Sequence, residues 1–475
     1  MKSENLYDSD LELRQYQNAK VDLPVDRQFA VGGNLSVNGL KSSTLGIAAG
    51  LTILSGVSVA STAANDKINL ALIGCGGRGR GVIAGFKSRK DTNIAYCCDV
   101  DKKRGESAAV KFNAKYAENM QTVFDDKSVD AVICATPDHW HSLCTFRAIQ
   151  AGKDVYVEKP VSHNAFEGQK CIEAARKYNR IVQHGTQNRS APYNIAAKKY
   201  IEDGRLGNIH LCRVYNMKKW GGLRIKKGEK TPENFNYDLW LGPAPNREYS
   251  SSIVYGGWHQ LWDFSAGDMA DDGVHQLDLA RWLIGKEIPK SAYATGGIFS
   301  RKDDSQTPDT LVATYDYDDL TFVFELALYP EYMQKIGDRN SDIFPVWQNC
   351  ATRIEIFGTK GLMVVGRHGG GWQVFDRPKN REPVVKAEQH GRVPEQEHWE
   401  NFIQCIRSRS VKDLNADIEK AHRSTMLVHY ATMSLLTGSA KLEINTNDGT
   451  IKNNPDAMKL WKREYRKQYE ITENV

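Results

Sequence analysis

A glycine-rich turn stands between an apolar run at residues 68–73 and a stretch with helical spacing. It reads Gly74-Cys75-Gly76-Gly77-Arg78-Gly79, and Asp99 follows 20 residues after its last glycine, at the end of the next apolar run. This spacing is typical of dinucleotide-binding turns, where glycines let the backbone approach a pyrophosphate and a helix N-terminus offers it N–H groups. Asp99 would accept hydrogen bonds from ribose hydroxyls and repel a 2′-phosphate, which favours NAD over NADP. The alternative is a structural glycine turn with an incidental aspartate.

The tripeptide Glu158-Lys159-Pro160 ends another apolar run, at residues 154–157. Ligands of open parallel sheets bind at the carboxyl ends of the strands, and a residue before proline is held extended rather than helical. The Lys159 ammonium could therefore hydrogen-bond a substrate hydroxyl and stabilise its developing alkoxide. The alternative is an ordinary solvated lysine on the surface.

A third motif carries a histidine between carboxylates. If residues 271–284 are helical, Asp271, His275 and Asp278 share one face, which Trp282 continues. Removal of hydride from a carbinol carbon leaves a hydroxyl proton, which a base such as His275, oriented by Asp271, can take. Two alternatives remain open: a structural His–Asp network, or a divalent metal site, for which the ligands fall short of a closed set. We expect no metal.

In this order, the glycine turn, Glu158-Lys159-Pro160 and the Asp-x-x-x-His helix resemble the glucose–fructose oxidoreductase, inositol dehydrogenase and rhizopine-catabolism (Gfo/Idh/MocA) oxidoreductases, from about Lys67 to the last helices. The resemblance implies that Lys159, Asp271 and His275 are the catalytic set. It adds Glu158 to the turn residues that bind the cofactor. It places further residues near the nicotinamide half, namely Thr136, Pro137, His141, Gln187 and Arg189. His139 and His141 could equally cap the start of a helix. Residues 240–245 resemble the exported sugar-processing branch of this family.

The sequence thus suggests a reversible NAD-dependent hydride transfer to or from a secondary hydroxyl of a sugar, glycoside or cyclitol. One alternative is a redox-neutral NAD-dependent glycosidase that oxidises a ring carbon transiently; the related glycosidases lack the lysine that stands here as Lys159. Another is a non-catalytic NAD-binding sensor, which would need no catalytic set. Aromatic and polar side chains that would suit a pyranose face, or the core equally well, are Tyr255, Trp258, His259 and Trp262.

Short apolar runs alternate with helical stretches in the first half of the regular part, which predicts βαβ units and a parallel Rossmann sheet. The predicted strands are 68–73, 93–98, 131–135, 154–157 and 180–184, and the predicted helices are 101–116, 139–151 and 165–178.

Beyond about residue 186, antiparallel hairpins predict an α+β domain with a mostly antiparallel open sheet. Its predicted strands are 210–216, 310–317 paired with 320–328, and 353–357 paired with 362–365; its helices are 271–284, 395–408 and 417–436. We expect an N-terminal extension (1–65), an NAD-binding Rossmann domain (66–187) and a substrate and oligomerisation domain (188–475), in a homo-oligomer.

The composition argues against some classes of partner, and the N-terminal sequence suggests a cellular location. The net charge of +5 is spread over 63 basic and 58 acidic residues, which argues against a nucleic-acid surface, and the nine cysteines show no C-x-x-C pair. Residues 44–64 are uncharged, follow Lys41 and end in small residues, which favours a cleaved export signal and no stable membrane span after processing. A cytoplasmic location is the alternative, because the preceding 43 residues are not basic and lack a twin arginine.

Overall fold

The computed structural model describes residues 67–329, 333–335, 343–393 and 395–475. The expected N-terminal extension and its uncharged stretch lie outside the described residues, so export stays a prediction. In the described ranges, no helix combines the length and apolarity that a membrane crossing requires.

The first half contains a parallel sheet of six strands in the order β3-β2-β1-β4-β5-β6, which confirms the predicted Rossmann sheet. The strands are β1 (Ile68–Ile73), β2 (Thr92–Cys98), β3 (Lys115–Ala117), β4 (Ala131–Cys134), β5 (Asp154–Val157) and β6 (Val182–His184). The helices are α2 (Gly77–Lys87), α3 (Lys102–Phe112), α4 (Met120–Asp125), α5 (Asp138–Gln150) and α6 (Ala165–Lys177). The strand order reverses between β1 and β4, where such sheets open a ligand crevice at their carboxyl edge.

One predicted helix is too long. Helix α3 ends at Phe112, and Asn113 adopts a left-handed conformation with φ 54°, which asparagine tolerates better than most residues. The chain then enters β3, beside β2. The prediction of helix over 101–116 is therefore wrong at its last residues.

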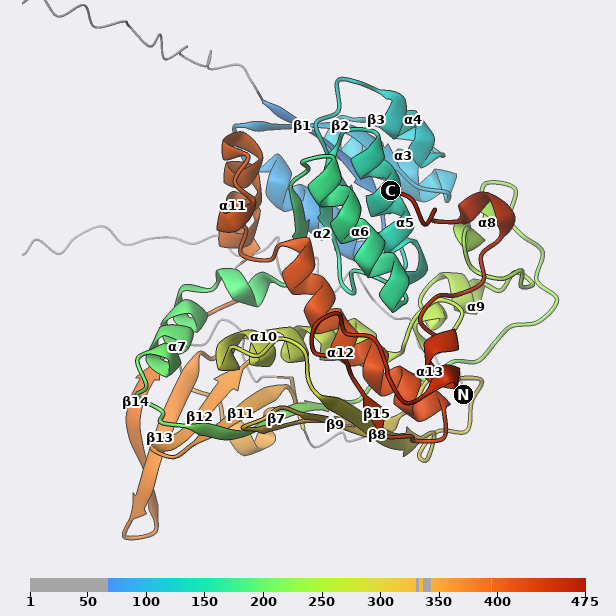
Figure 1. Ribbon diagram of the computed structural model, residues 1–475. Helices are drawn as coiled ribbons and strands as arrows, with labels where there is room; N and C mark the ends of the chain where they lie inside the picture. Colours follow the sequence, from blue (N-terminus) through green and yellow to red (C-terminus); the bar gives the residue numbers. More distant parts are fainter. Residues whose placement is uncertain (1–66, 330–332, 336–342, 394) are drawn as a thin grey trace, which may run out of the picture. The chain divides into compact units, whose positions relative to one another are not determined.

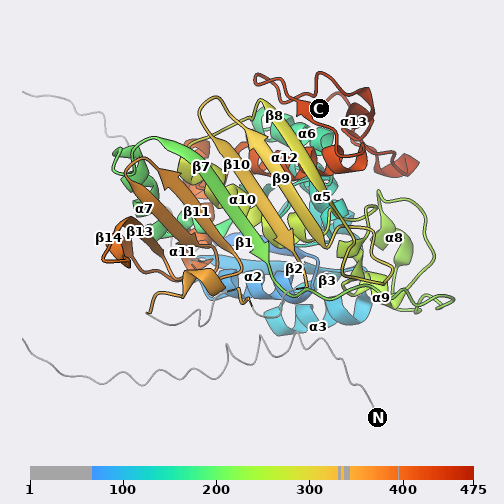
Figure 2. The same ribbon diagram turned by 90° about the horizontal axis from the view of Figure 1, so that it is seen from below.

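The second half contains a nine-stranded sheet in the order β14-β13-β12-β11-β7-β10-β9-β8-β15. The strands are β7 (Ile209–Met217), β8 (Ser291–Gly297), β9 (Thr310–Asp316), β10 (Thr321–Ala327), β11 (Arg353–Gly358), β12 (Gly361–Gly366), β13 (Trp372–Lys379), β14 (Glu382–Gln389) and β15 (Leu442–Glu443). Only the β7–β10 pair is parallel in the described sheet, so the mostly antiparallel architecture and both predicted hairpins are confirmed. Strands β8, β13, β14 and β15 were not predicted. Figure 2 shows β7, β10, β9 and β8 side by side.

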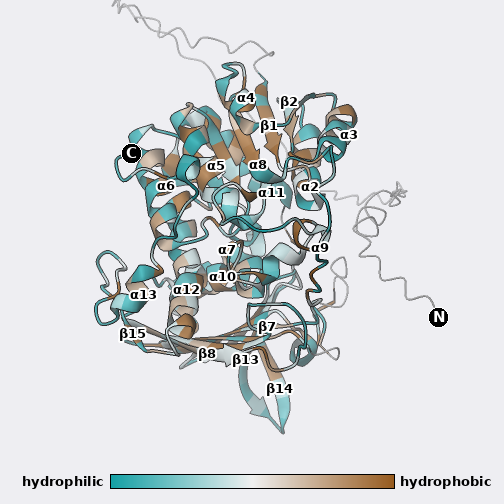
Figure 3. Ribbon diagram, turned by 90° about the vertical axis from the view of Figure 1, so that its right-hand side faces the viewer, coloured by the Kyte–Doolittle hydropathy of each residue, from teal (hydrophilic) through white to brown (hydrophobic). Residues whose placement is uncertain are grey.

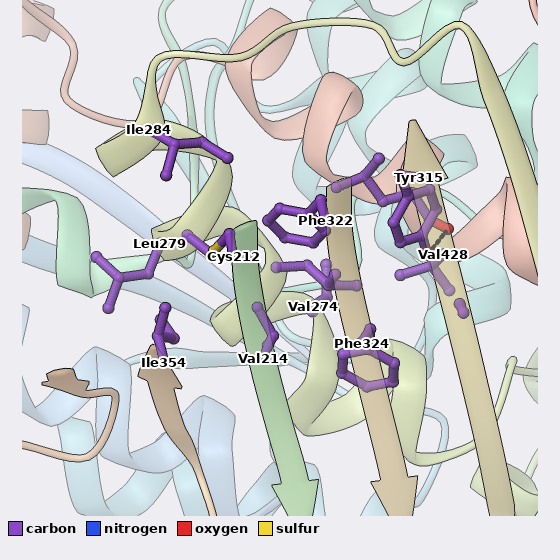
Figure 4. Packing of buried hydrophobic residues seen from close by; sticks show 14 of the residues in the cluster. Cys212, Val214, Val274, Leu279, Ile284, Tyr315, Phe322, Phe324, Ile354 and Val428 are labelled. Carbon is purple, nitrogen blue, oxygen red and sulfur yellow. Dashed lines mark hydrogen bonds between the residues drawn. The ribbon is translucent and has the colours of Figure 1, made fainter. Parts of the chain in front are cut away.

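Two helices, α10 (Val274–Ile284) and α12 (Ile418–Leu436), cover one face of this sheet (Figure 1). Figure 4 shows the packing, in which Phe322 and Phe324 of β10 meet Val274 of α10, and Tyr315 lies beside Val428 of α12. The Tyr315 hydroxyl donates to the Leu427 carbonyl at 2.6 Å. By contrast, much of β14 is exposed, and Figure 3 shows it in a hairpin that projects from the sheet and carries both hydrophilic and hydrophobic colours.

The end of the chain returns to the parallel sheet. Trp399 and Phe402 of α11 (Glu395–Ser408) pack on Phe86 of α2, with ring centroids 5.8 and 6.1 Å away. Tyr469 packs against Trp140 of α5 at 5.4 Å. The core of the parallel-sheet half thus includes residues that the predicted division into 66–187 and 188–475 assigns to the other half.

Candidate active site

The glycine turn is tightly packed on one side and open on the other. A Cβ at Gly79 would lie 2.0 Å from the Gly74 carbonyl oxygen, and one at Gly74, where φ is 93°, would lie 2.4 Å from the Ala135 oxygen. At Gly77 a Cβ would meet nothing within 4 Å. Gly76 begins α2 without a side-chain cap, and no acidic residue stands in the first turn. An open helix N-terminus of this kind fits the pyrophosphate of a dinucleotide.

Asp99 lies beside this turn at the end of β2. Its Oδ2 accepts the Cys75 N–H at 2.7 Å and its Oδ1 accepts the Asp101 N–H at 2.9 Å. Burial raises the pKa of Asp99, against the opposing effect of the Arg104 guanidinium. Because a carboxylate has about four acceptor positions, Asp99 can still accept bonds from a ribose.

The rim of the turn carries a network of three residues predicted to bind the cofactor. Arg78 Nε lies 2.8 Å from Glu158 Oε1, and Arg78 also pairs with Glu395 of α11 at 2.7 Å. The Gln187 amide oxygen accepts from Arg78, and its nitrogen donates to the Gly185 carbonyl at 2.9 Å. Glu158 Oε2 is buried and accepts no hydrogen bond in the part of the chain that the structure describes. It is an acceptor that a bound ligand could use.

The two histidines after Thr136 contact backbone carbonyl groups. His141 is buried, with Nδ1 2.7 Å from the Pro160 carbonyl and Nε2 2.8 Å from the Thr136 carbonyl. It thereby joins the segments that follow β4 and β5, including the one that carries Lys159. Both histidines lie inside α5, whose N-cap is Pro137, so neither caps the helix. His139 Nε2 lies 2.9 Å from the Trp240 carbonyl.

Arg189 and Asp278 form a buried pair. Arg189 Nε lies 2.8 Å from Asp278 Oδ2, its NH2 donates to Oδ1 at 2.8 Å, and the two side chains are 3% and 0% exposed. Ser424 of α12 donates to Asp278 as well, at 2.7 Å. Arg189 and Asp278 therefore satisfy each other's polar groups, and the bond from Ser424 links α10 to α12.

The expected helical face is interrupted by a π-helical turn. Met269–Gly273 is π-helical and α10 begins only at Val274, so the regular spacing of Asp271, His275 and Asp278 does not apply. Such turns often occur at functional sites. Here the turn directs Asp271 toward Lys159 instead of His275: Lys159 Nζ donates to Asp271 Oδ1, and no hydrogen bond joins Asp271 to His275 among the described residues.

Lys159 and Asp271 form a charged pair. Burial lowers the pKa of Lys159, but the Asp271 carboxylate, helped by Asp138, raises it overall. Burial likewise raises the pKa of Asp271, but Lys159 and His259 hold it well below its usual range. Lys159 is therefore an ammonium at neutral pH, able to donate a hydrogen bond but not to act as a base.

His275 is 5% exposed, and its Nδ1 has no hydrogen-bond partner among the described residues. Burial, together with the positive charges of Arg367 and Lys159, lowers its pKa well below the ordinary value. His275 is thus neutral at neutral pH, the form in which an imidazole can accept a proton.

Two further titratable residues lie near the Lys159–Asp271 pair: Asp138, to which the sequence assigned no role, and His259, which it offered only as a candidate for a sugar face or the core. Asp138 accepts a hydrogen bond from Ser265 Oγ at 2.6 Å, and burial raises its pKa to about 7 although Lys159 opposes the shift. His259 lies on a short turn, its ring stacked 3.5 Å from that of Trp258, and burial lowers its pKa to about 4 against the effect of Asp271. Asp138 stands two residues after Thr136, and that position was the available signal.

A buried ion cluster supports the π turn from behind. Lys218, which directly follows β7, lies 3.0 Å from Asp268 and 2.6 Å from Asp272, and Arg367 lies 3.3 Å from Asp272. In the described ranges, no three His, Cys, Asp or Glu side chains gather as metal ligands would.

Two models of one family match the chain. The oxidoreductase family with an NAD-binding Rossmann fold matches residues 68–186, and its C-terminal alpha/beta domain matches residues 196–319. Inositol 2-dehydrogenase of Rhizobium meliloti (strain 1021) is 22% identical over 296 residues, which cover 62% of this chain and 74% of that protein. D-glucoside 3-dehydrogenase of Escherichia coli (strain K12) is 24% identical over 266 residues, 55% of this chain and 67% of that protein.

Solved structures agree on the fold. The WlbA dehydrogenase from Bordetella pertussis, solved with NADH and UDP-GlcNAcA, has a TM-score of 0.59 at 20% identity and covers 80% of this chain and 99% of its own. The aldose-aldose oxidoreductase from Caulobacter crescentus has a TM-score of 0.60 at 16% identity, with 80% and 100% covered. With both family models matched in order along the same chain, the protein is an oxidoreductase of the Gfo/Idh/MocA family.

Proposed function

We propose that this oxidoreductase transfers hydride between NAD and a secondary hydroxyl of a sugar, glycoside or cyclitol. The observation that carries the proposal is the Lys159–Asp271 pair, which lies where β5 ends in the parallel sheet and lies within electrostatic range of the neutral His275. A fixed ammonium and a neutral imidazole are the donor and the acceptor that alcohol oxidation requires.

Lys159, His275 and Asp271 have different roles in this reaction. Lys159 donates a hydrogen bond to the reacting oxygen and stabilises its developing negative charge, and His275 accepts the hydroxyl proton. Asp271 keeps Lys159 charged and fixed in position, so its role differs from the orientation of His275 that the sequence suggested. When bound, the nicotinamide takes up the hydride that leaves the carbinol carbon.

Asp99 supports NAD rather than NADP as the cofactor. A 2′-phosphate beside its carboxylate would meet repulsion, although Arg104 lies close enough to offset part of it. We expect NAD to bind at least about tenfold more tightly than NADP, which corresponds to about 1.4 kcal/mol. Titration of both cofactors checks this, and equal binding would mean that Asp99 does not contact the ribose.

Two measurements on the purified protein test the proposed function. Mass spectrometry and absorbance show whether NAD or NADH co-purifies, and a panel of methyl glycosides, free sugars and inositols is then screened for reduction of NAD. We expect NADH to form with at least one polyol in the wild type and to be lost in Lys159→Ala. A protein that binds neither NAD nor NADH would contradict the proposal.

A further inference from the structure

The segment between β7 and α10 crosses to the parallel-sheet half and attaches at the start of α3. Phe235 forms an antiparallel bridge with Asp101. Two backbone hydrogen bonds flank the bridge, from the Lys102 N–H to the Asn234 carbonyl and from the Asn236 N–H to the Val100 carbonyl, both 2.9 Å long. These contacts begin one residue after Asp99, so the segment lies beside the position where an adenosine ribose is expected.

Tyr255, which directly follows the short helix α9 (Ser251–Val254), makes further side-chain contacts with the start of α3. Its hydroxyl donates to Asp101 Oδ2 at 3.0 Å. Its ring packs edge-on against Phe235 and carries the Arg104 guanidinium 5.1 Å from its centroid. The residue is still 48% exposed, so much of the ring remains available to a ligand.

Arg104 links this ring to the glycine turn. Its NH1 lies 3.8 Å from the place where a Cβ at Gly76 would stand, and its charge acts on Asp99. A guanidinium that stacks on an aromatic ring is held flat and loses little further entropy when it binds an anion or stacks on a base. Tyr255 therefore stacks on a guanidinium that lies beside Gly76 and acts on Asp99, the residue expected at the adenosine ribose.

We propose that Tyr255, although it comes from the second half of the chain, belongs to the dinucleotide site. It positions Arg104 against the adenosine half of the cofactor, and residues 232–255 form a strap that slows cofactor release. This inference rests on the proposed function, because it assumes that NAD binds at the glycine turn. It goes beyond that function by assigning cofactor retention to a segment outside the Rossmann sheet.

Stopped-flow fluorescence of NADH with the full chain tests the strap. In Tyr255→Ala we expect NADH to dissociate about tenfold faster, because the stacking and the hydrogen bond are both lost. Tyr255→Phe keeps the ring and loses only the bond to Asp101, so we expect release about two- to threefold faster. The matched control is Tyr293→Ala, a tyrosine of β8 that is 38% exposed. We expect it to behave as the wild type.

Two fragments of the cofactor locate the effect. ADP-ribose should bind Tyr255→Ala more weakly by a factor similar to that for NADH, whereas nicotinamide mononucleotide should bind both proteins equally. If Tyr255→Ala does not fold, Arg104→Lys keeps the charge, loses the planar stack and is expected to release NADH several-fold faster.

The outcomes separate the two proposals. A wild type that fails to bind NADH would contradict the proposed function itself. A wild type that binds NADH, with unchanged release in Tyr255→Ala or, where that variant does not fold, in Arg104→Lys, would overturn the strap alone. A lower melting temperature with unchanged NADH release would show that Tyr255 only ties the two halves together, and it would overturn the strap as well.

Discussion

At the residue scale, the partner of Asp271 determines how the site works. A carboxylate beside a lysine keeps the lysine charged, whereas a carboxylate beside a histidine raises the basicity of the imidazole. The structure gives Asp271 to Lys159, and His275 has no hydrogen bond to a carboxylate among the described residues. His275 would then act as a weak base, and the strong electrostatic stabilisation of the reacting oxygen would come from Lys159.

The first prediction concerns these two groups. His275→Ala should slow hydride transfer by roughly 10²–10⁴, the usual contribution of a positioned general base. Lys159→Ala should slow the same step, and the double variant should lose less than the product of the two effects, because both groups serve one transition state. Single-turnover formation of NADH measures this, with NADH affinity determined separately for each variant.

His259 is the alternative candidate for the base in this experiment. Its ring lies on Trp258 and 5.5 Å from that of Trp220, and it is in electrostatic contact with Asp271, so it could accept a proton if His275 does not. Near-normal hydride transfer in His275→Ala, with strong loss in His259→Ala, would reassign the base to His259.

The second prediction concerns pH. In Asp271→Asn the carboxylate that raises the pKa of Lys159 is lost, while burial, which lowers that pKa, remains. Lys159 should then lose its proton at a lower pH, and hydride transfer should fall off earlier on the alkaline side than in the wild type. A pH–rate profile measures the shift, and Asp271→Glu, which keeps the charge, should largely restore the wild-type profile. An identical alkaline limb in Asp271→Asn would contradict the assignment of Asp271 to Lys159.

At the element scale, the parallel sheet could be predicted because its buried strands are continuous apolar runs and its turn residues follow at once. The helix end at Asn113 could not, because helical spacing continues past it and only the left-handed backbone stops the helix. A spacing of 3.6 residues per turn likewise cannot predict the π turn at Met269–Gly273, so the sequence placed Asp271 with His275, whereas in the structure it pairs with Lys159. The contact of Arg78 with Glu395 joins residues 317 positions apart, and no local pattern reports it.

The third prediction separates packing from binding in the glycine turn. Gly79→Ala puts a methyl group against the Gly74 backbone, which cannot move aside easily, and should cost about 1–3 kcal/mol of unfolding free energy. Gly77→Ala meets open space and should leave the free energy of unfolding within about 0.5 kcal/mol, yet weaken NADH binding by filling the pyrophosphate site. Chemical denaturation and NADH titration of both variants test this. Unchanged NADH binding in Gly77→Ala would show that the phosphates lie elsewhere.

At the scale of the whole molecule, burial lowers the pKa of several histidines in the described part of the chain. Burial lowers the pKa of His139, His184 and His429 to about 3 and that of His398 to about 4. Their ring nitrogens contact groups such as the Trp240 carbonyl and Ser162 Oγ. Three aspartates shift in the opposite direction: burial raises the pKa of Asp99, that of Asp138 to about 7 and that of Asp268 to about 6.

The last prediction follows from these opposing shifts. Between pH 4 and the ordinary histidine pKa of about 6.5, these histidines bind protons in the unfolded chain but not in the folded one. Each histidine with a lowered pKa therefore makes the free energy of unfolding fall as the pH falls, by up to about 1.4 kcal/mol per pH unit. Asp99, Asp138 and Asp268 act in the reverse sense, because the folded state holds their protons more tightly. The histidines outnumber them, so we expect unfolding free energy to drop steeply below about pH 6.5, before the paired carboxylates such as Asp271 titrate. Urea denaturation from pH 4.5 to 8 measures the slope. His429→Gln should reduce it. A flat profile across this range would mean that the folded and unfolded chains bind equal numbers of protons there, and it would contradict this prediction.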